Sequence, residues 1–361
     1  MAEAATSVSI LKDLGVVGAI ATVTSAIITG LLSLYFKSRS DKVLETLKAD
    51  LASENNKAIE KLKADLTYEN KLKSARVDYE YDARKRLYKE VEPIIFAAHL
   101  ATASVRGRLL PMVERLRAGD ISLDSKKNWL ATDPYYLRST AYRIFLPLVF
   151  EYILSSRISQ YDFALEPLIG RKYMALAVFH EIPTGDFNLA QIVEPRVPYD
   201  PYAKVSETER KADVAKYMFQ GIVRGDVQRF TALMTSTGEK PLPLEWYKFE
   251  QDLENEQSSL AKAFVPVHNT LFNLHPVTHP VAWRAIIAYA LLAEFFIEAR
   301  EFTIEEYDKL MEALGWKKFD FREKPDDVED IVVQRHFEAA RLYVQGRLRA
   351  RFKTLHTAAA A

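Results

Sequence analysis

The hydrophobic pattern of the chain opens with a segment that contains no charged residue, from Leu14 to Phe36. A helix over these 23 residues would be about 34 Å long, and the hydrocarbon layer of a bilayer is roughly 30 Å thick. The run is too long for the apolar core of a signal peptide, and no small-residue cleavage site follows it. The pattern therefore predicts a retained transmembrane helix over 14–36, preceded by a leader over 1–13. A buried helix of a globular domain is the alternative.

Basic residues flank this segment unequally. Lys12 alone precedes it, whereas Lys37, Arg39, Lys42 and Lys48 follow it. Basic residues accumulate on the cytoplasmic side of transmembrane helices. We expect a single-pass protein of the cell inner membrane, with its N-terminus outside and its C-terminal domain in the cytoplasm.

Small and hydroxylated residues form one face of the predicted transmembrane helix. They are spaced by three or four positions: Gly15, Gly18, Thr22, Ser25, Thr29 and Ser33. Small residues let helices approach closely, and hydroxyls can hydrogen-bond across the interface, so the face indicates self-association. One alternative is a narrow polar pore lined by the hydroxyls, and another is a lone anchor. The absence of charge within the span argues against ion-coupled transport.

A second apolar pattern runs through the highly charged segment 37–92. The pentapeptide LKADL occurs at 47–51 and again at 62–66, so apolar positions recur fifteen residues apart: Leu44, Leu47, Leu51, Ile59, Leu62 and Leu66. Fifteen residues over four turns is about 3.75 per turn, which favours a straight or slightly right-handed bundle. We expect a long coiled-coil-like stalk that packs against the same helix of other subunits and ends at Pro93. Packing against the downstream domain is the alternative.

Helix signals dominate the remaining chain, and strand signals are weak. Asp133 precedes Pro134 at a predicted helix start, and Ser206 with Glu209 forms a capping box before a helix expected to reach Met234. A second capping box is predicted over 303–306. The sequence thus predicts an all-α domain over 93–356, followed by a short tail over 357–361.

Two stretches of this domain have a more specific pattern. Residues 279–301 predict a buried helix, because about 15 apolar residues interrupted by Glu294 are too few and too polar for a second membrane span. Residues 182–205 contain four prolines and predict a long surface loop or a hinge between two helical subregions.

The composition offers little material for catalysis or metal binding. The chain has 49 basic and 49 acidic residues and no cysteine, which excludes disulfides, thiolate zinc sites and a cysteine nucleophile. His268, His275 and His279 are the densest histidine cluster, but prolines interrupt any helix that would present them together. His180 and Glu181 lack the second histidine of a metalloprotease motif. We expect no catalytic site, no metal and no cofactor.

The last predicted helix is rich in basic residues: Arg341, Arg347, Arg349, Arg351 and Lys353. Such a helix can lie on an anionic lipid surface, with each nearby charge contributing about 1 kcal/mol. A solvated terminal helix is the alternative, and the balanced overall charge makes nucleic acid an unlikely partner.

Two segments together resemble a group of uncharacterised bacterial membrane-anchored proteins. They are YDARKRLYKEVEPIIFAAHLATASVRGRL at 81–109 and DPYYLRSTAYRIFLPL at 133–148. The resemblance implies a bacterial origin and a coiled helix ahead of an α-helical domain. It implies no activity and no functional residue.

These patterns predict a membrane-anchored homo-oligomer whose cytoplasmic domain acts as a scaffold or sensor. Its expected partners are membrane lipid, further copies of itself, and another protein or a small ligand on the cytoplasmic domain. The alternative is a membrane effector, pore-forming or membrane-disrupting, as in bacterial antiviral defence. A third possibility is an anchored hydrolase.

Overall fold

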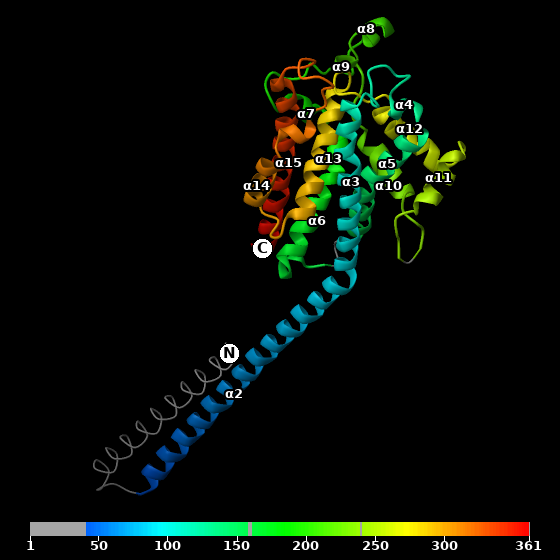
Figure 1. Cartoon of the computed structure of the whole chain (residues 1–361). Helices are drawn as coiled ribbons and strands as arrows, with labels where there is room; N and C mark the ends of the chain where they lie inside the picture. The colour runs from blue at the N-terminus through cyan, green and yellow to red at the C-terminus, as the bar shows by residue number, and fades with distance from the viewer. Residues whose placement is uncertain (1–40, 158–160, 239, 361) are drawn as a thin grey trace. The chain divides into compact units, whose positions relative to one another are not determined.

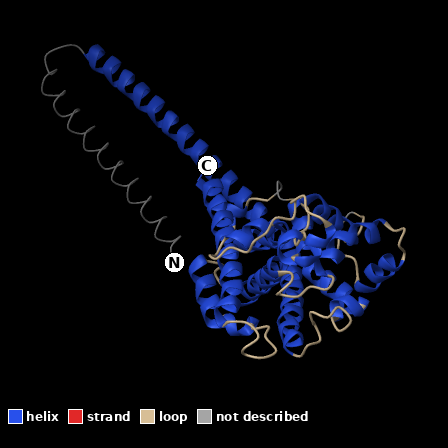
Figure 2. Ribbon diagram, turned by 90° about the horizontal axis from the view of Figure 1, so that it is seen from above, coloured by secondary structure: helices blue, strands red, loops and turns tan. Residues whose placement is uncertain are grey.

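The computed structural model describes residues 41–157, 161–238 and 240–360. Every regular element in this part of the chain is helical, apart from an isolated β-bridge between Thr235 and Pro243 (Figure 2). The predicted all-α class is therefore confirmed. The chain divides into two compact units, residues 1–79 and residues 80–361. The predicted leader and transmembrane helix lie outside the described residues.

Helix α2 runs from Asp41 to Arg86 and contains 46 residues, which corresponds to about 69 Å. Neither glycine nor proline interrupts it. Every described side chain of the first unit, residues 53–79, is exposed to solvent. The predicted long helix is present, and its apolar positions within 53–79 are not covered by other described parts of the same unit.

The prediction that Pro93 ends this helix is wrong. Helix α2 passes directly into a π-helical turn, η1 (Leu87–Val91), and then into α3 (Glu92–Arg117). Pro93 lies in the first turn of α3, where proline is tolerated because its missing N–H leaves few helical hydrogen bonds unmade. Leu87 and Val91 are fully buried, so the π turn belongs to the hydrophobic core of the second unit.

The core of the second unit, here called the body, is built mainly from five helices in its described part. These are α3, α5 (Pro134–Ser155), α6 (Pro167–Glu181), α13 (Pro280–Glu298) and α15 (Asp330–Ala360), which pack side by side (Figure 1). Helix α13 is central, because it contacts α3, α6 and α15. Its Trp283 and Phe295 are completely buried, which confirms the buried helix predicted over 279–301.

Helix α13 is also the one described helix that is long and apolar enough to cross a membrane. However, 89% of its apolar window is buried inside the body. A central core helix of a globular domain can have the length and composition of a membrane span. Its burial here agrees with the role predicted for this segment.

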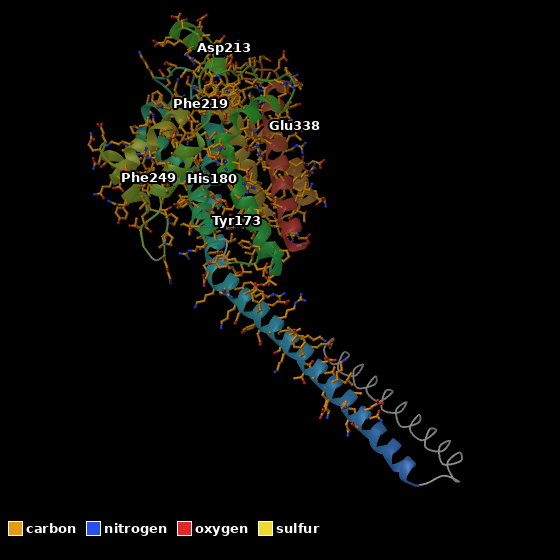
Figure 3. All side chains as sticks on the ribbon, turned by 180° about the vertical axis from the view of Figure 1, so that it is seen from behind. Tyr173, His180, Asp213, Phe219, Phe249 and Glu338 are labelled. Atoms are coloured by element: carbon orange, nitrogen blue, oxygen red, sulfur yellow. The ribbon has the colours of Figure 1, made fainter. Side chains whose placement is uncertain are left out.

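Shorter helices complete the body. Helices α4 (Trp129–Thr132), α10 (Arg224–Leu233), α11 (Trp246–Glu254) and α12 (Ser259–Leu271) pack near α5. Aromatic rings join them: the ring centroids of Phe145 and Phe230 are 4.8 Å apart, and those of Phe230 and Phe249 are 6.3 Å apart. Figure 3 labels Phe249 among these side chains. Helix α14 (Ile304–Leu314) and the 3₁₀ turn η5 (Trp316–Phe319) pack against α15, and a further 3₁₀ turn, η3 (Phe163–Leu165), precedes α6.

The predicted loop over 182–205 is wrong in its first half. A 3₁₀ turn, η4 (Ile182–Thr184), and helix α7 (Asp186–Gln191) occupy that half, and irregular chain follows from Ile192 to Ser206. Pro183 lies at the start of η4, where its fixed φ suits a helical turn. Leu189 and Ala190 are completely buried, so tertiary packing outweighs the turn signal of the prolines.

The helix caps predicted at Asp133 and Ser206 are present, but the length predicted for the helix after Ser206 is not. The Asp133 side chain accepts from the Tyr136 N–H, and Ser206 and Glu209 form the predicted reciprocal capping box. However, the single helix predicted from Ser206 to Met234 is wrong. The chain instead forms α8 (Glu207–Ala212), α9 (Val214–Tyr217) and then α10, because Asp213 ends α8 and caps α9 with its side chain.

The capping box predicted over 303–306 is half right. Thr303 accepts from the Glu306 N–H and so caps α14. The Glu306 carboxylate does not return to Thr303; it accepts from the N–H groups of residues 300–302. The preceding turn, with Phe302 at a positive φ of 55°, directs those three amides toward the carboxylate.

Candidate functional site

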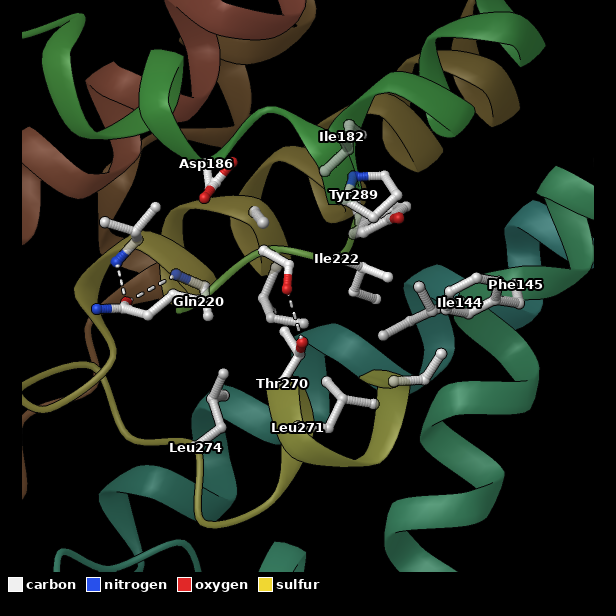
Figure 4. Close-up of a pocket in the computed structure, with 17 residues that line it drawn as sticks. Ile144, Phe145, Ile182, Asp186, Gln220, Ile222, Thr270, Leu271, Leu274 and Tyr289 are labelled. Carbon is white, nitrogen blue, oxygen red and sulfur yellow. Dashed lines mark hydrogen bonds between the residues drawn. The ribbon is translucent and has the colours of Figure 1, made fainter. Parts of the chain in front are cut away.

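A small cavity lies within the body between α5, α12, α13 and the chain after α6 (Figure 4). Its volume is about 40 Å³, and its wall is mostly apolar, with Ile144, Ile222, Leu271 and Ile286 among its side chains. A single internal water needs roughly 10–15 Å³ by this measure. The cavity therefore has room for two or three waters, and not for a metabolite of ordinary size.

One hydroxyl in the cavity wall lacks a protein partner. Tyr289 is only 3% exposed, and its phenolic oxygen makes no hydrogen bond with the described residues. An unpaired buried hydroxyl costs about 1–3 kcal/mol, which a water in the cavity would offset. Burial raises the pKa of Tyr289 well above its usual value, so the hydroxyl keeps its proton and can donate.

A buried polar network borders the same cavity and connects α7 with the start of α13. The Tyr199 hydroxyl donates to Asp186 Oδ2 at 2.7 Å and accepts from the Gln220 N–H at 2.9 Å. Gln220 Oε1 then accepts from the first free amides of α13, the N–H groups of Val281 (2.9 Å) and Ala282 (3.3 Å). Such amides have no partner within their own helix, so Gln220 acts as a distant cap.

The electrostatics of this network favour a structural role. Burial raises the pKa of Asp186, and the hydrogen bond from Tyr199 opposes that shift. A Cβ at position 221 would meet the Asp186 side chain at 2.7 Å, so this position requires glycine. The side-chain oxygen Oδ2 of Asp186 and both amide atoms of Gln220 are paired with protein atoms. We find no nucleophile and base in contact among the described residues that line the cavity.

An ionic cluster joins α5, α6 and α15 at a second place in the body. The Arg351 Nε donates to Glu181 Oε1 at 2.6 Å, and Arg347 Nε lies 3.5 Å from Glu181 Oε2. Glu151 of α5 and Tyr173 of α6 are hydrogen-bonded through their side chains. Burial raises the pKa of Glu151 to about 7, although nearby Arg351 and the Tyr173 hydroxyl both lower it.

The basic residues predicted to contact lipid are divided by the structure into two groups. Arg347 and Arg351 are held by Glu181, and Arg341 pairs with Glu338 at 2.6 Å and with Asp308 at 3.4 Å. Of these five residues, only Arg349 and Lys353 are exposed, and the other three are half-buried. Three of the predicted lipid contacts therefore fix α15 to neighbouring carboxylates. Glu181, the residue that holds two of them, belongs in the sequence only to an incomplete metalloprotease motif, and nothing there indicates these ion pairs.

The histidine cluster has local structural roles. His275 Nδ1 accepts from the Val277 N–H at 3.2 Å, and His279 Nδ1 lies 2.9 Å from the Thr278 hydroxyl. Burial lowers the pKa of His275 to about 4, so its ring is neutral at pH 7. Among the described residues, no group of three or more histidine and carboxylate side chains is arranged to hold a metal ion.

The two predicted self-association surfaces differ in what the structure describes. Gly15, Gly18, Thr22, Ser25, Thr29 and Ser33 lie outside the described residues. Leu44, Leu47 and Leu51 are in α2, and their side chains are not described. Ile59, Leu62 and Leu66 are described and are 51%, 55% and 45% exposed.

In comparisons with family models, curated proteins and solved structures, nothing matches this chain. The resemblance to a bacterial group therefore stays a prediction, and the function rests on the residues themselves.

Proposed function

We propose that this chain is a membrane-anchored helical protein that assembles with copies of itself through α2 and presents its all-α body as a scaffold. The observation that carries the proposal is the exposed apolar row of α2, formed by Ile59, Leu62 and Leu66. A long helix in water is stabilised mainly by packing of its apolar face. Within the first unit, no described residue covers this row.

The spacing and size of the row suit a second copy of the same helix. Each of the three side chains is about half exposed, and burying that remaining area contributes on the order of 1 kcal/mol per residue. The LKADL repeat places equivalent residues fifteen positions apart along the helix, and parallel copies in register bring each of these residues beside its own equivalent. Membrane attachment is supported by the uncharged segment 14–36, and the flanking basic residues support a cytoplasmic body in the inner membrane.

The interior cavity supports neither a small-molecule sensor nor a hydrolase. The body cavity of about 40 Å³ is far smaller than the roughly 300–1,000 Å³ of typical ligand sites. The principal polar side chains that border it are hydrogen-bonded to other protein groups, apart from Tyr289.

The proposal is tested by the mass of the full-length protein in mild detergent, measured by light scattering and corrected for bound detergent. We expect an oligomer, and we expect a smaller mass when Ile59, Leu62 and Leu66 are all replaced by glutamate. The control is Lys57→Glu with Ala64→Glu, which changes the net charge by the same three units on the opposite face of α2. A monomeric wild-type protein, or equal masses for the two variants, would refute the proposal.

A membrane effector is the second candidate function. The feature that favours it is the hydroxyl face Thr22, Ser25, Thr29 and Ser33 of the uncharged segment. In a ring of four or more copies, such a face can line a narrow polar pore. A mass of one or two subunits would leave too few helices for a ring and would exclude a pore of this kind.

A further inference from the structure

Helix α3 exposes an apolar face to solvent along most of its length. The exposed positions are spaced by three or four residues and carry no charge: Pro93, Phe96, Leu100, Ala103, Gly107 and Pro111. Phe96 is 63% exposed and Leu100 is 57% exposed. A surface helix normally presents polar residues on its solvent side, and a contiguous apolar strip marks an interaction surface. From Pro93 to Pro111 the strip extends over 18 residue steps of helix, which corresponds to about 27 Å.

The C-terminal half of this face borders a groove of about 760 Å³. Its apolar residues come from α3 and from the ends of α13 and α14: Ala103, Gly107, Leu110, Pro111, Ile297 and Leu314. A Cβ added at Gly107 would meet nothing within 4 Å, so the groove is open at this position. Because Ala103 and Gly107 are small residues, another helix can approach the α3 backbone closely here.

Charged groups of both signs border the groove. Arg106 is paired with Glu294 at 2.7 Å, and Arg117 Nε donates to the Asp320 carbonyl at 2.6 Å. Lys317 and Lys318 of η5 and Glu114 of α3 line the same groove, and we find no ion pair between them and other described residues. An entirely acidic partner would leave Glu114 without a partner, whereas a surface that carries both signs can complement itself.

The sequence interval of the exposed side chains favours a second copy of this chain as the partner. Leu66, Tyr81 and Phe96 follow one another at fifteen residues and are 45%, 66% and 63% exposed. This is the interval of the LKADL repeat, on which the self-association of α2 was inferred. A flat lipid surface does not fill a concave groove, whereas a neighbouring helix does.

We propose that the α3 face, formed by Phe96, Leu100, Ala103, Gly107 and Pro111, is a second self-association surface, occupied by α3 of another copy in parallel orientation. This inference rests on the proposed function and extends the assembly from α2 to the body. Parallel packing places each residue near its own equivalent, with Phe96 beside Phe96 and Ala103 beside Ala103.

The chain contains no cysteine, so a single engineered cysteine reports contact without background. Phe96→Cys and Ala103→Cys are each introduced into the full-length protein in mild detergent and oxidised, and the products are separated on a non-reducing gel. A disulfide needs Cα atoms roughly 4.4–6.8 Å apart. We expect both variants to shift to disulfide-linked dimers. The control, Tyr247→Cys on the exposed side of α11, should remain a single chain.

The groove is tested separately by adding Gly107→Leu to each cysteine variant. Because an added Cβ at this position meets nothing within 4 Å in its own chain, the body should fold normally while the disulfide-linked dimer is lost. The matched control is Gly346→Leu on α15, where an added Cβ also meets nothing within 4 Å. Dimers that persist with Gly107→Leu and with Gly346→Leu alike would overturn the proposal.

The outcomes separate this inference from the proposed function. An oligomer by light scattering without disulfides at positions 96 and 103 would refute the α3 interface and leave the α2 assembly intact. A disulfide at 103 without one at 96 would refute the parallel orientation. Disulfides at both positions in the variant with glutamate at 59, 62 and 66 would support the α3 face even if α2 proved dispensable.

Discussion

Replacing Glu151 by glutamine should stabilise the body at alkaline pH and leave it nearly unchanged at acidic pH. Burial between α5, α6 and α15 is the main reason that the pKa of Glu151 rises from 4.5 to about 7. The folded protein therefore binds this proton more tightly than the unfolded chain does. The stability that protonated Glu151 provides is complete below about pH 4.5 and is lost as the pH rises through 7.

The size of the effect follows from the shift. Each pKa unit corresponds to 1.36 kcal/mol, so a rise to about 7 corresponds to up to about 3 kcal/mol between pH 4.5 and pH 8. Glutamine has the same shape, carries no charge and still accepts a hydrogen bond from Tyr173. Arg351 keeps its pairing with Glu181, so the substitution leaves no buried charge alone.

The assay is urea unfolding of the full-length protein in mild detergent at pH 5 and pH 8, followed by tryptophan fluorescence. The buried neutral histidines, His275 and His336, act in the opposite direction, because their lowered pKa makes the fold lose stability as the pH falls below 6.5. They are present in both proteins, so the difference between variant and wild type isolates Glu151. Glu329→Gln, at an exposed carboxylate, is the control.

We expect the unfolding free energy of Glu151→Gln to exceed that of the wild type by up to about 3 kcal/mol at pH 8 and by less than about 1 kcal/mol at pH 5, where the folded glutamate is still protonated. A difference that is the same at both pH values would show that the glutamate does not titrate in this range. A variant less stable than the wild type at pH 8 would show that the carboxylate is stabilised by its neighbours, contrary to the reasoning.

Three further predictions address the cavity, its network and the membrane segment. Gln220→Ala should destabilise the body by about 2–5 kcal/mol in urea unfolding, because two buried amides of α13 and one carbonyl lose their partner; a change below 1 kcal/mol would mean that water replaces the side chain. Tyr289→Phe should stabilise the body by about 1–3 kcal/mol if the hydroxyl is unpaired, because the cost of burying it is removed, and a loss of stability in the same assay would reveal a hydrogen-bonded water in the cavity. If the hydroxyl face lines a pore, Ser25→Leu with Thr29→Leu should abolish bilayer conductance while membrane insertion, measured by fractionation, is retained; unchanged conductance would exclude that lining.

The predictions that depended on local chemistry were the most accurate. Asp133 and Ser206 cap helices as predicted, because a side-chain oxygen next to free helix amides needs only a few residues of context. The apolar richness of 279–301 correctly predicted a buried helix, since that many apolar side chains need cover. By contrast, Pro93 failed as a stop signal, because proline is tolerated in the first turn of a new helix.

Contacts between distant residues could not be predicted in this way. Glu181 holds Arg347 and Arg351, which lie 166 and 170 residues later, and Gln220 caps a helix that begins 60 residues later. Neither residue belongs to a complete motif or a repeat. The exposed face of α3 could not be predicted either, because a strip such as Phe96, Leu100 and Ala103 has the spacing of a buried helix face. Only the positions of the other helices show which side of α3 is covered.

The sequence by itself determined that the chain is helical, where several helices begin, that residues 279–301 contain a buried helix, and where an uncharged segment and a fifteen-residue repeat lie. These properties follow from local spacing, from capping groups and from the cost of exposing apolar surface to water. Only the tertiary structure decided which apolar faces remain uncovered, which arginines are held by carboxylates, and that the interior cavity is too small for an ordinary ligand. Those properties depend on how helices distant in the sequence pack together. The residues next to a side chain along the sequence do not specify which residues contact it in the folded protein.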